Sequence, residues 1–146
     1  MKKIILQPKY IKFKKQQKGV LAPIEWTYIA TTLSFGLYGI KVLKSSRLSL
    51  KQLETIRRQI SKYLRNYETL IFRIRPDIPV TKKPNEIRMG KGKGSLNFWA
   101  CKIKAGQILV EFQLLSLKKA QKIFIAVAKK LPIPSILVIN QNKIFS

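Results

Sequence analysis

Apolar residues recur at steps of three and four along residues 49–67, which predicts an amphipathic helix beginning at Ser49. Ser49 and Gln52 match a capping box, in which each side chain accepts a hydrogen bond from the other's backbone N–H. The stripe comprises Leu50, Leu53, Ile56, Ile60, Leu64 and Tyr67. A second stripe, between Ser116 and Pro132, predicts a second helix. It comprises Leu117, Ala120, Phe124, Val127 and Leu131.

Short runs of β-branched and aromatic residues predict the strands. These runs occupy residues 33–42, 70–75, 97–104, 108–114 and 136–139. Gly36 and Gly39 interrupt the first run, where a glycine suggests a bulge or a close backbone approach. The third and fourth runs flank residues 104–107 and predict a hairpin. The proline-punctuated segment after residue 75 is expected to be a loop. This order predicts an α+β fold with a mainly antiparallel sheet packed with two helices.

The net charge of the chain then limits the classes of function that it can have. The 146 residues include 30 Lys and Arg but only 6 Asp and Glu, a formal net charge of +24. A compact domain this basic repels itself, and an anionic partner relieves that repulsion. Because 46% of the residues are apolar, the chain is too hydrophobic for a disordered basic protein. We therefore expect one globular domain, residues 20–146, that binds a polyanion.

Residues 1–19 differ from the rest of the chain. They hold seven lysines and no acid, so they have too little apolar surface and too much repulsion to fold alone. One interpretation is a disordered, solvated tail. We favour a basic N-terminal arm that becomes ordered on phosphates.

The residue inventory excludes several kinds of enzyme. The chain has no His and one Cys, so a zinc site and His-dependent nucleophilic catalysis are not expected. Cys101 stands in an apolar stretch and is predicted to be a small buried hydrophobe. The scattered acids are expected to be internal salt-bridge partners, although an acid pair from distant segments stays open as an alternative. No metal and no cofactor are expected, and no apolar run has the 18–20 residues that membrane insertion needs.

The most unusual local feature is a string of alternating glycines and lysines. Its residues are Arg88, Met89, Gly90, Lys91, Gly92, Lys93 and Gly94. Glycines let a backbone approach a ligand closely, and lysines supply charge, which together suit phosphates. The string lacks the spacing of a Walker loop and of a dinucleotide-binding loop. A nucleotide-binding enzyme and a loose solvated hairpin remain alternatives to a loop inserted against nucleic acid.

This string, followed by Asn97-Phe98-Trp99, resembles the bacterial-type ribosomal protein L-sixteen family of the large subunit. Further blocks keep the family's order and spacing from about residue 6 to 139. They lie at residues 6–9, 12–19, 34–41, 47–48, 57–58, 74–84 and 129–133. The segments 20–31 and 44–47 depart from the family pattern, which leaves their RNA contacts open.

The resemblance implies an α+β structural protein, not an enzyme, that binds large-subunit rRNA near the central protuberance. It also implies neighbouring large-subunit proteins as partners, closeness to tRNA in the A site, and a role in late subunit assembly. The string at residues 88–94 becomes the tRNA-proximal loop. The candidate rRNA-binding residues are Lys9, Lys12, Lys14, Lys15, Lys18, Lys41, Arg47, Arg57, Arg58, Arg73 and Arg75.

Two further functions and three compartments stay open. The alternatives are a free-standing RNA-binding or ribosome-assembly factor and a cationic membrane-surface protein, which would need an amphipathic helix free to insert. Lys outnumbers Arg 23 to 7, which is typical of an AT-rich genome. Because no clear presequence is seen, we expect an organelle-encoded protein of the mitochondrial ribosome. A plastid or a bacterial cytoplasm is the alternative.

Overall fold

The computed structural model defines two antiparallel sheets and a pair of helices, of which one contacts the smaller sheet and the other the larger. It describes residues 8, 10–13, 15–17, 19, 21, 28–64, 69–90, 92–114 and 116–140. The α+β class expected from the sequence is confirmed.

The larger sheet has four strands in the order β3-β6-β1-β7. Their bounds are β1 Tyr38–Val42, β3 Leu70–Phe72, β6 Ile108–Phe112 and β7 Ser135–Ile139. β1 lies between β6 and β7, so Ile40 pairs with Val110 on one side and with Leu137 on the other. This central position explains why Ile40 and Val110 are fully buried.

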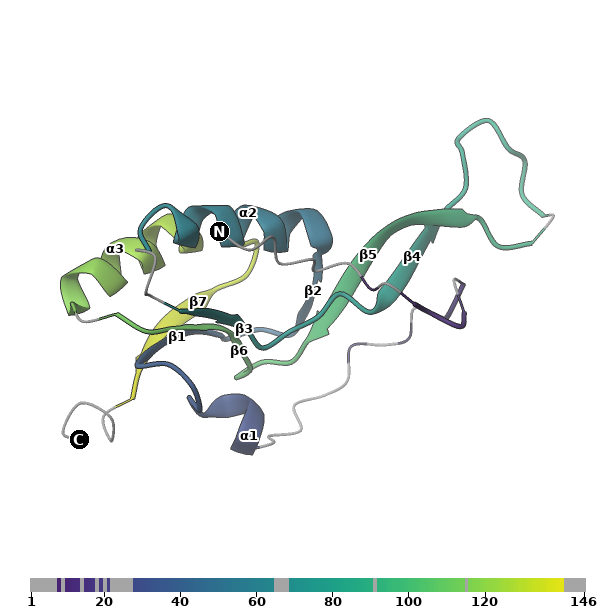
Figure 1. The fold of residues 1–146 in the computed structure, drawn as a ribbon. Helices are drawn as coiled ribbons and strands as arrows, with labels where there is room; N and C mark the ends of the chain where they lie inside the picture. The colour runs from purple at the N-terminus through teal and green to yellow at the C-terminus, as the bar shows by residue number, and fades with distance from the viewer. Residues whose placement is uncertain are drawn as a thin grey trace.

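Two long helices, α2 (Leu50–Ser61) and α3 (Leu117–Ala128), lie side by side over one face of this sheet, and the single-turn helix α1 (Tyr28–Thr31) lies on the other side (Figure 1). The predicted capping box is confirmed: the Ser49 hydroxyl accepts from the Gln52 N–H, and Gln52 Oε1 accepts from the Ser49 N–H at 2.8 Å. Helix α2 ends earlier than its apolar stripe, and Tyr67 lies outside the described residues. Both helices bury their apolar faces in the core, through Leu53, Ile56, Ile60, Ala120, Ile123 and Val127.

The smaller sheet has the order β2-β5-β4, with bounds β2 Ser46–Ser49, β4 Ile78–Lys82 and β5 Ser95–Ile103. Strands β4 and β5 form a curved ribbon that projects away from the helices and carries residues 83–94 at its tip (Figure 1). We call β4, β5 and this loop the ribbon.

The predicted hairpin of residues 97–104 and 108–114 is wrong. Strand β5 pairs with β2 and β4, whereas β6 pairs with β1 and β3. The turn at residues 104–107 therefore passes the chain from one sheet to the other. It is held by Val42, whose carbonyl accepts from the Gly106 N–H at 2.7 Å and whose N–H donates to the Gln107 carbonyl at 3.0 Å.

Two other expectations also need correction. The proline-rich segment expected as a loop contains β4, because an edge strand tolerates Pro79 and its missing N–H. Residues 33–37 are not strand, since β1 begins at Tyr38. The close approach expected at the glycines is confirmed: a Cβ added to Gly36 would lie 2.8 Å from the Phe112 carbonyl oxygen, and one at Gly39 would collide with the Leu33 side chain.

Candidate nucleic-acid interface

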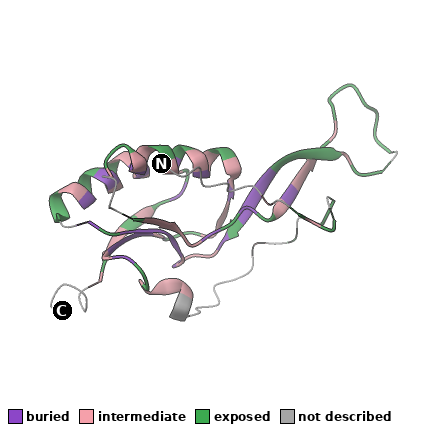
Figure 2. Cartoon of the chain, viewed as in Figure 1, coloured by how far each residue is buried: buried purple, intermediate pink, exposed green. Residues whose placement is uncertain are grey.

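The ribbon has a solvated outer half and a buried inner half. The first four residues of β5 are exposed, and burial begins at Trp99 (Figure 2). The outer half therefore has little role in the core and is available to a partner.

Cys101, in the inner half, is buried as predicted. Its thiol is 3.6 Å from the Leu48 carbonyl oxygen, and burial raises its pKa to about 11.

The loop at the tip is strongly basic. Residues 83–94 contain four cations, at positions 83, 88, 91 and 93, and one acid, Glu86. Arg88, Met89 and Lys93 are exposed, Met89 almost completely at 99%. Lys91 lies outside the described residues.

The three glycines of the loop are favoured for different structural reasons. Gly90 and Gly92 have φ of +103° and +80°, and a Cβ added to either would meet nothing within 4 Å. Their backbone conformation, and not lack of space, favours glycine there. Gly94 is different, because its added Cβ would lie 2.6 Å from the Lys82 carbonyl oxygen. It allows β5 to start close against β4.

Lys15 and Gln16, in the described part of the N-terminal arm, lie against the ribbon (Figure 1). The Lys15 ammonium donates to the Lys93 carbonyl at 3.1 Å, and the Lys93 ammonium donates to the Gln16 carbonyl at 2.5 Å. Lys83 donates in the same way to the Gly90 carbonyl. Each of these acceptors is an uncharged carbonyl, and each ammonium has three donors, so these bonds do not neutralise the lysines.

Gly19, the last residue of the arm, lies against the smaller sheet. Arg47 donates to the Gly19 carbonyl, and a Cβ added to Gly19 would lie 2.8 Å from Lys102 Nζ. Arg47 and Lys102 are direct partners across the β2–β5 pair. Like charges directly opposite one another destabilise a sheet, and an anion between them removes the penalty.

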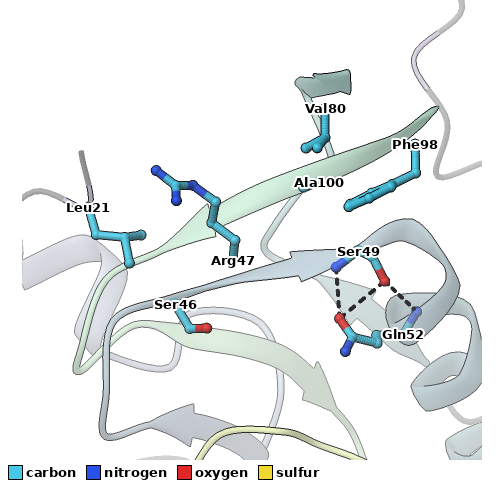
Figure 3. A pocket seen from close by; sticks show the side chains of 8 residues that line it. All are labelled: Leu21, Ser46, Arg47, Ser49, Gln52, Val80, Phe98 and Ala100. Carbon is cyan, nitrogen blue, oxygen red and sulfur yellow. Dashed lines mark hydrogen bonds between the residues drawn. The ribbon is translucent and has the colours of Figure 1, made fainter. Parts of the chain in front are cut away.

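A cleft of about 510 Å³ opens on the same face of this sheet (Figure 3). It is lined by Leu21, Ser46, Arg47, Ser49, Gln52, Val80, Phe98 and Ala100. The Arg47 guanidinium lies at one end and the Phe98 ring at the other (Figure 3). We call this the sheet cleft. A second cleft, of about 520 Å³, includes Arg75, Asp77 and Lys102 in its lining.

The structure brings only some of the predicted RNA-binding residues together. Lys15 contacts the ribbon at Lys93, Arg47 lines the sheet cleft, and Arg75 lines the second cleft. Lys12 is exposed beside the Phe13 ring, at 5.6 Å from its centroid. Other predicted residues lie elsewhere: Lys41 in β1, and Arg57 and Arg58 on α2. Lys9, Lys14 and Lys18 lie outside the described residues.

Arg73 has an internal partner. Its guanidinium forms an ion pair with Glu111, whose side chain is fully buried, and donates to the Thr32 carbonyl at 2.9 Å. Burial alone would raise the pKa of Glu111, but hydrogen bonds from the Gly36 N–H, Arg73 and the Phe35 and Ser34 N–H groups outweigh it and hold the pKa below its usual value. Glu111 is thus the internal salt-bridge partner that the scarcity of acids predicted.

Sequence reasoning missed Lys83, Lys102 and the cleft residue Phe98. The Lys82-Lys83 pair just before the glycine and lysine string was a usable signal for the first. No local pattern marks the other two, because their importance comes from neighbours on adjacent strands.

Other chemistries find no support in the part of the chain that the structure describes. Its His, Cys, Asp and Glu residues form no group of three or more that could hold a metal ion. Its helices are also too short and too polar for any of them to span a bilayer.

The structure is a small α+β domain that has a projecting basic ribbon and cations lying side by side. These features define a protein suited to binding a polyanion through its surface. The chain belongs to the family described as ribosomal protein L16p/L10e, whose family model matches residues 8–138. The resemblance seen in the sequence is therefore confirmed. The family consists of structural, non-enzymatic proteins, in agreement with the expectation that the chain is not an enzyme.

Bacterial relatives named "Large ribosomal subunit protein uL16" match most of the chain. The protein from Maricaulis maris is 42% identical over 134 residues, which cover 92% of this chain and 96% of that protein. The one from Chelativorans sp. is 42% identical over 129 residues, or 88% and 93% of the two chains. The one from Xylella fastidiosa is 37% identical over 136 residues, or 93% and 98%.

Proposed function

We propose that the chain is a structural constituent of the large ribosomal subunit and binds its rRNA through the ribbon, the arm and the smaller sheet. The family and the names of the relatives support a ribosomal role. The observation that carries the RNA-binding surface is the meeting of Lys15 with Lys93 and of Arg47 with Lys102. Cations held this close favour a partner that presents phosphates at short intervals.

The finer assignment follows from the family resemblance. We assign the domain, residues 20–146, to rRNA near the central protuberance, beside neighbouring large-subunit proteins, with a role in late assembly. The loop carrying Arg88, Lys91 and Lys93 is assigned to the A-site tRNA environment. Its support is that the loop is basic and lies at the far end of the ribbon, with Arg88, Met89 and Lys93 exposed.

The compartment is a separate proposal. A mitochondrial ribosome, with the protein encoded in the organelle, is supported by the excess of Lys over Arg and the abundance of Ile. The bacterial relatives favour a bacterial-type ribosome, which fits the bacterial alternative as well as an organelle. Localising a tagged full-length chain in its own cells distinguishes them.

The alternative function is a free-standing RNA-binding or assembly factor, which the same basic surface would serve. Sedimentation separates the two. A structural constituent should stay with mature large subunits after a wash in high salt and should be present at about one copy per subunit. A free-standing factor should be released by the wash or be confined to immature particles, and that result would overturn the proposed function.

A further inference from the structure

The face of the smaller sheet that carries Arg47 also carries an aromatic residue, Phe98, which phosphate binding alone does not require. Side chains alternate along β5, so Trp99 and Cys101 point into the protein, whereas Phe98 and Ala100 line the sheet cleft. Phe98 is paired with Val80 across the ribbon, and Ala100 with Ser49 on the other side. The cleft floor is therefore built by three adjacent strands and is not a gap in a loop.

One end of the sheet cleft is apolar and flat. Phe98 is 38% exposed and its ring lies over the cleft with Val80 and Ala100 on the same side, whereas Leu21 lies at the Arg47 end (Figure 3). A single exposed aromatic residue is common on protein surfaces and needs no partner. Here the ring belongs to a cleft of about 510 Å³, which has room for a planar group on its face.

The other end of the cleft is cationic. Arg47 lines it, and Lys102 stands directly opposite Arg47 on the neighbouring strand. The lining residues, all from the described part of the chain, include Ser and Gln but no carboxylate. A ligand that fits has a flat, apolar part for Phe98 and an anionic part for the cations. A nucleotide has both parts.

We propose that the sheet cleft holds one unstacked nucleobase of a single-stranded RNA segment, with the base stacked on Phe98 and a flanking phosphate at Arg47 and Lys102. Bases of every kind stack on aromatic side chains, because each has a π face. An intact duplex keeps its bases inside the stack, so the cleft selects single-stranded RNA over double-stranded RNA. The inference rests on the proposed RNA-binding function and adds a specific site and strand form to it.

The test compares Phe98→Leu with Phe98→Tyr in the full-length protein. Leu keeps apolar bulk without the π face, whereas Tyr keeps the ring. Tyr63→Leu is the matched control, because Tyr63 is 39% exposed and lies just past the end of α2, in a hollow that it lines with Lys122 and Ile125 of α3 and not in the sheet cleft. Each protein is titrated with a single-stranded oligoribonucleotide and with a duplex of equal charge, and its thermal unfolding is recorded to confirm that it is folded.

We expect Phe98→Leu to weaken single-strand binding roughly tenfold, the loss of one stacked base, and to leave duplex binding unchanged. Phe98→Tyr and the control should bind as the wild type does. Equal losses on both RNAs, or no loss on either, would overturn the inference.

The outcome is separable from that of the proposed function. If wild-type protein stays with large subunits in high salt while Phe98→Leu binds single strands normally, the ribosomal role stands and the stacking site falls. If the protein does not stay with subunits yet loses single-strand binding through Phe98→Leu, the site stands and the ribosomal role falls.

Discussion

Arg73 and Glu111 form a buried ion pair that joins the end of β3 to the middle strand β6. The carboxylate is completely shielded from solvent and the guanidinium side chain is 13% exposed. Glu111 also accepts hydrogen bonds from the Phe35 N–H at 2.7 Å and the Gly36 N–H at 2.9 Å. One carboxylate therefore fixes the segment before β1, which the sequence pattern had assigned to a strand.

Replacing Glu111 with Gln should destabilise the protein by about 3 kcal/mol at neutral pH, because Arg73 is left without its charged partner. The pKa of Glu111 is lowered in the folded state. Its contribution is therefore present above the unfolded pKa, about 4.3, and is lost as pH falls through the folded value. Urea unfolding of both proteins between pH 7 and pH 3 measures this. A difference between them that does not shrink under acid conditions would contradict the prediction.

Cys101 should be inert in the folded protein. Its thiol is buried and its pKa is raised to about 11, so almost no thiolate forms near neutral pH. A thiol-specific chromogenic reagent should react slowly in buffer at about pH 8 and quickly in denaturant. Fast reaction without denaturant, with far-UV circular dichroism unchanged, would mean that β5 opens far more readily than its burial implies.

The loop glycines should respond differently to alanine. Gly94→Ala brings a Cβ against the Lys82 carbonyl and should cost about 1–3 kcal/mol of stability. Gly92→Ala places its Cβ in open space and should cost on the order of 1 kcal/mol, through the positive φ alone. Thermal unfolding compares the two, and a larger loss for Gly92→Ala would refute this order. For this comparison, Gly92→Val would be a poorer probe than Gly92→Ala, because a β-branched residue adds further strain at positive φ.

The double variant Lys91→Ala, Lys93→Ala tests the assignment of the loop to tRNA. Lys93 is exposed and both residues belong to the loop at the tip of the ribbon, so subunits should incorporate the variant normally, whereas they should bind aminoacyl-tRNA in the A site less well. Lys118→Ala, Lys122→Ala on α3 removes the same charge from another exposed surface and serves as control. Normal aminoacyl-tRNA binding at full occupancy of the loop variant would rule out the tRNA role and leave rRNA binding intact.

The arm, residues 1–19, should be cut first by trypsin in the free protein and protected in the subunit. The arm has seven lysines and no acid of its own. The contacts that its described residues make with Lys93 and Arg47 use backbone carbonyls, which carry no charge. Phosphates would supply charged partners. Mass spectrometry of the fragments gives the order of cleavage. Equal protection of the arm in free and bound protein would show that RNA is not what orders it.

Local signals predicted the parts of the fold that local interactions determine. Ser49 and Gln52 are three residues apart, and their capping box begins α2 where the sequence predicted. The partners of β5 could not be predicted, because alternation indicates which face a residue occupies and not which strand lies beside it. Strand β2 was missed for a related reason: it is four residues long, and Leu48 is its one apolar residue.

The residues of the candidate site also differ in whether the sequence alone could reveal them. The string at residues 88–94 is contiguous in sequence, so its chemistry could be recognised before the fold was known. The Arg47–Lys102 pair and the sheet cleft join residues more than 50 positions apart, and only the register of β2 with β5 brings them together. For Arg73, the charge alone suggested a contact with RNA, whereas the structure shows an ion pair with the buried Glu111.

The place of β1 in the larger sheet has a consequence for how the protein is made. Strand β1 ends at Val42, whereas its neighbours β6 and β7 begin at Ile108 and Ser135, so both pairings join segments that are far apart in the sequence. Pairings between such distant segments form slowly and leave apolar strands exposed in the meantime. Because translation runs from β1 towards β7, the larger sheet cannot close until residue 139 has left the ribosome, and until then β1 lacks one of its two neighbours. Completion of this sheet is therefore tied to the synthesis of β7 and not to the emergence of any earlier segment.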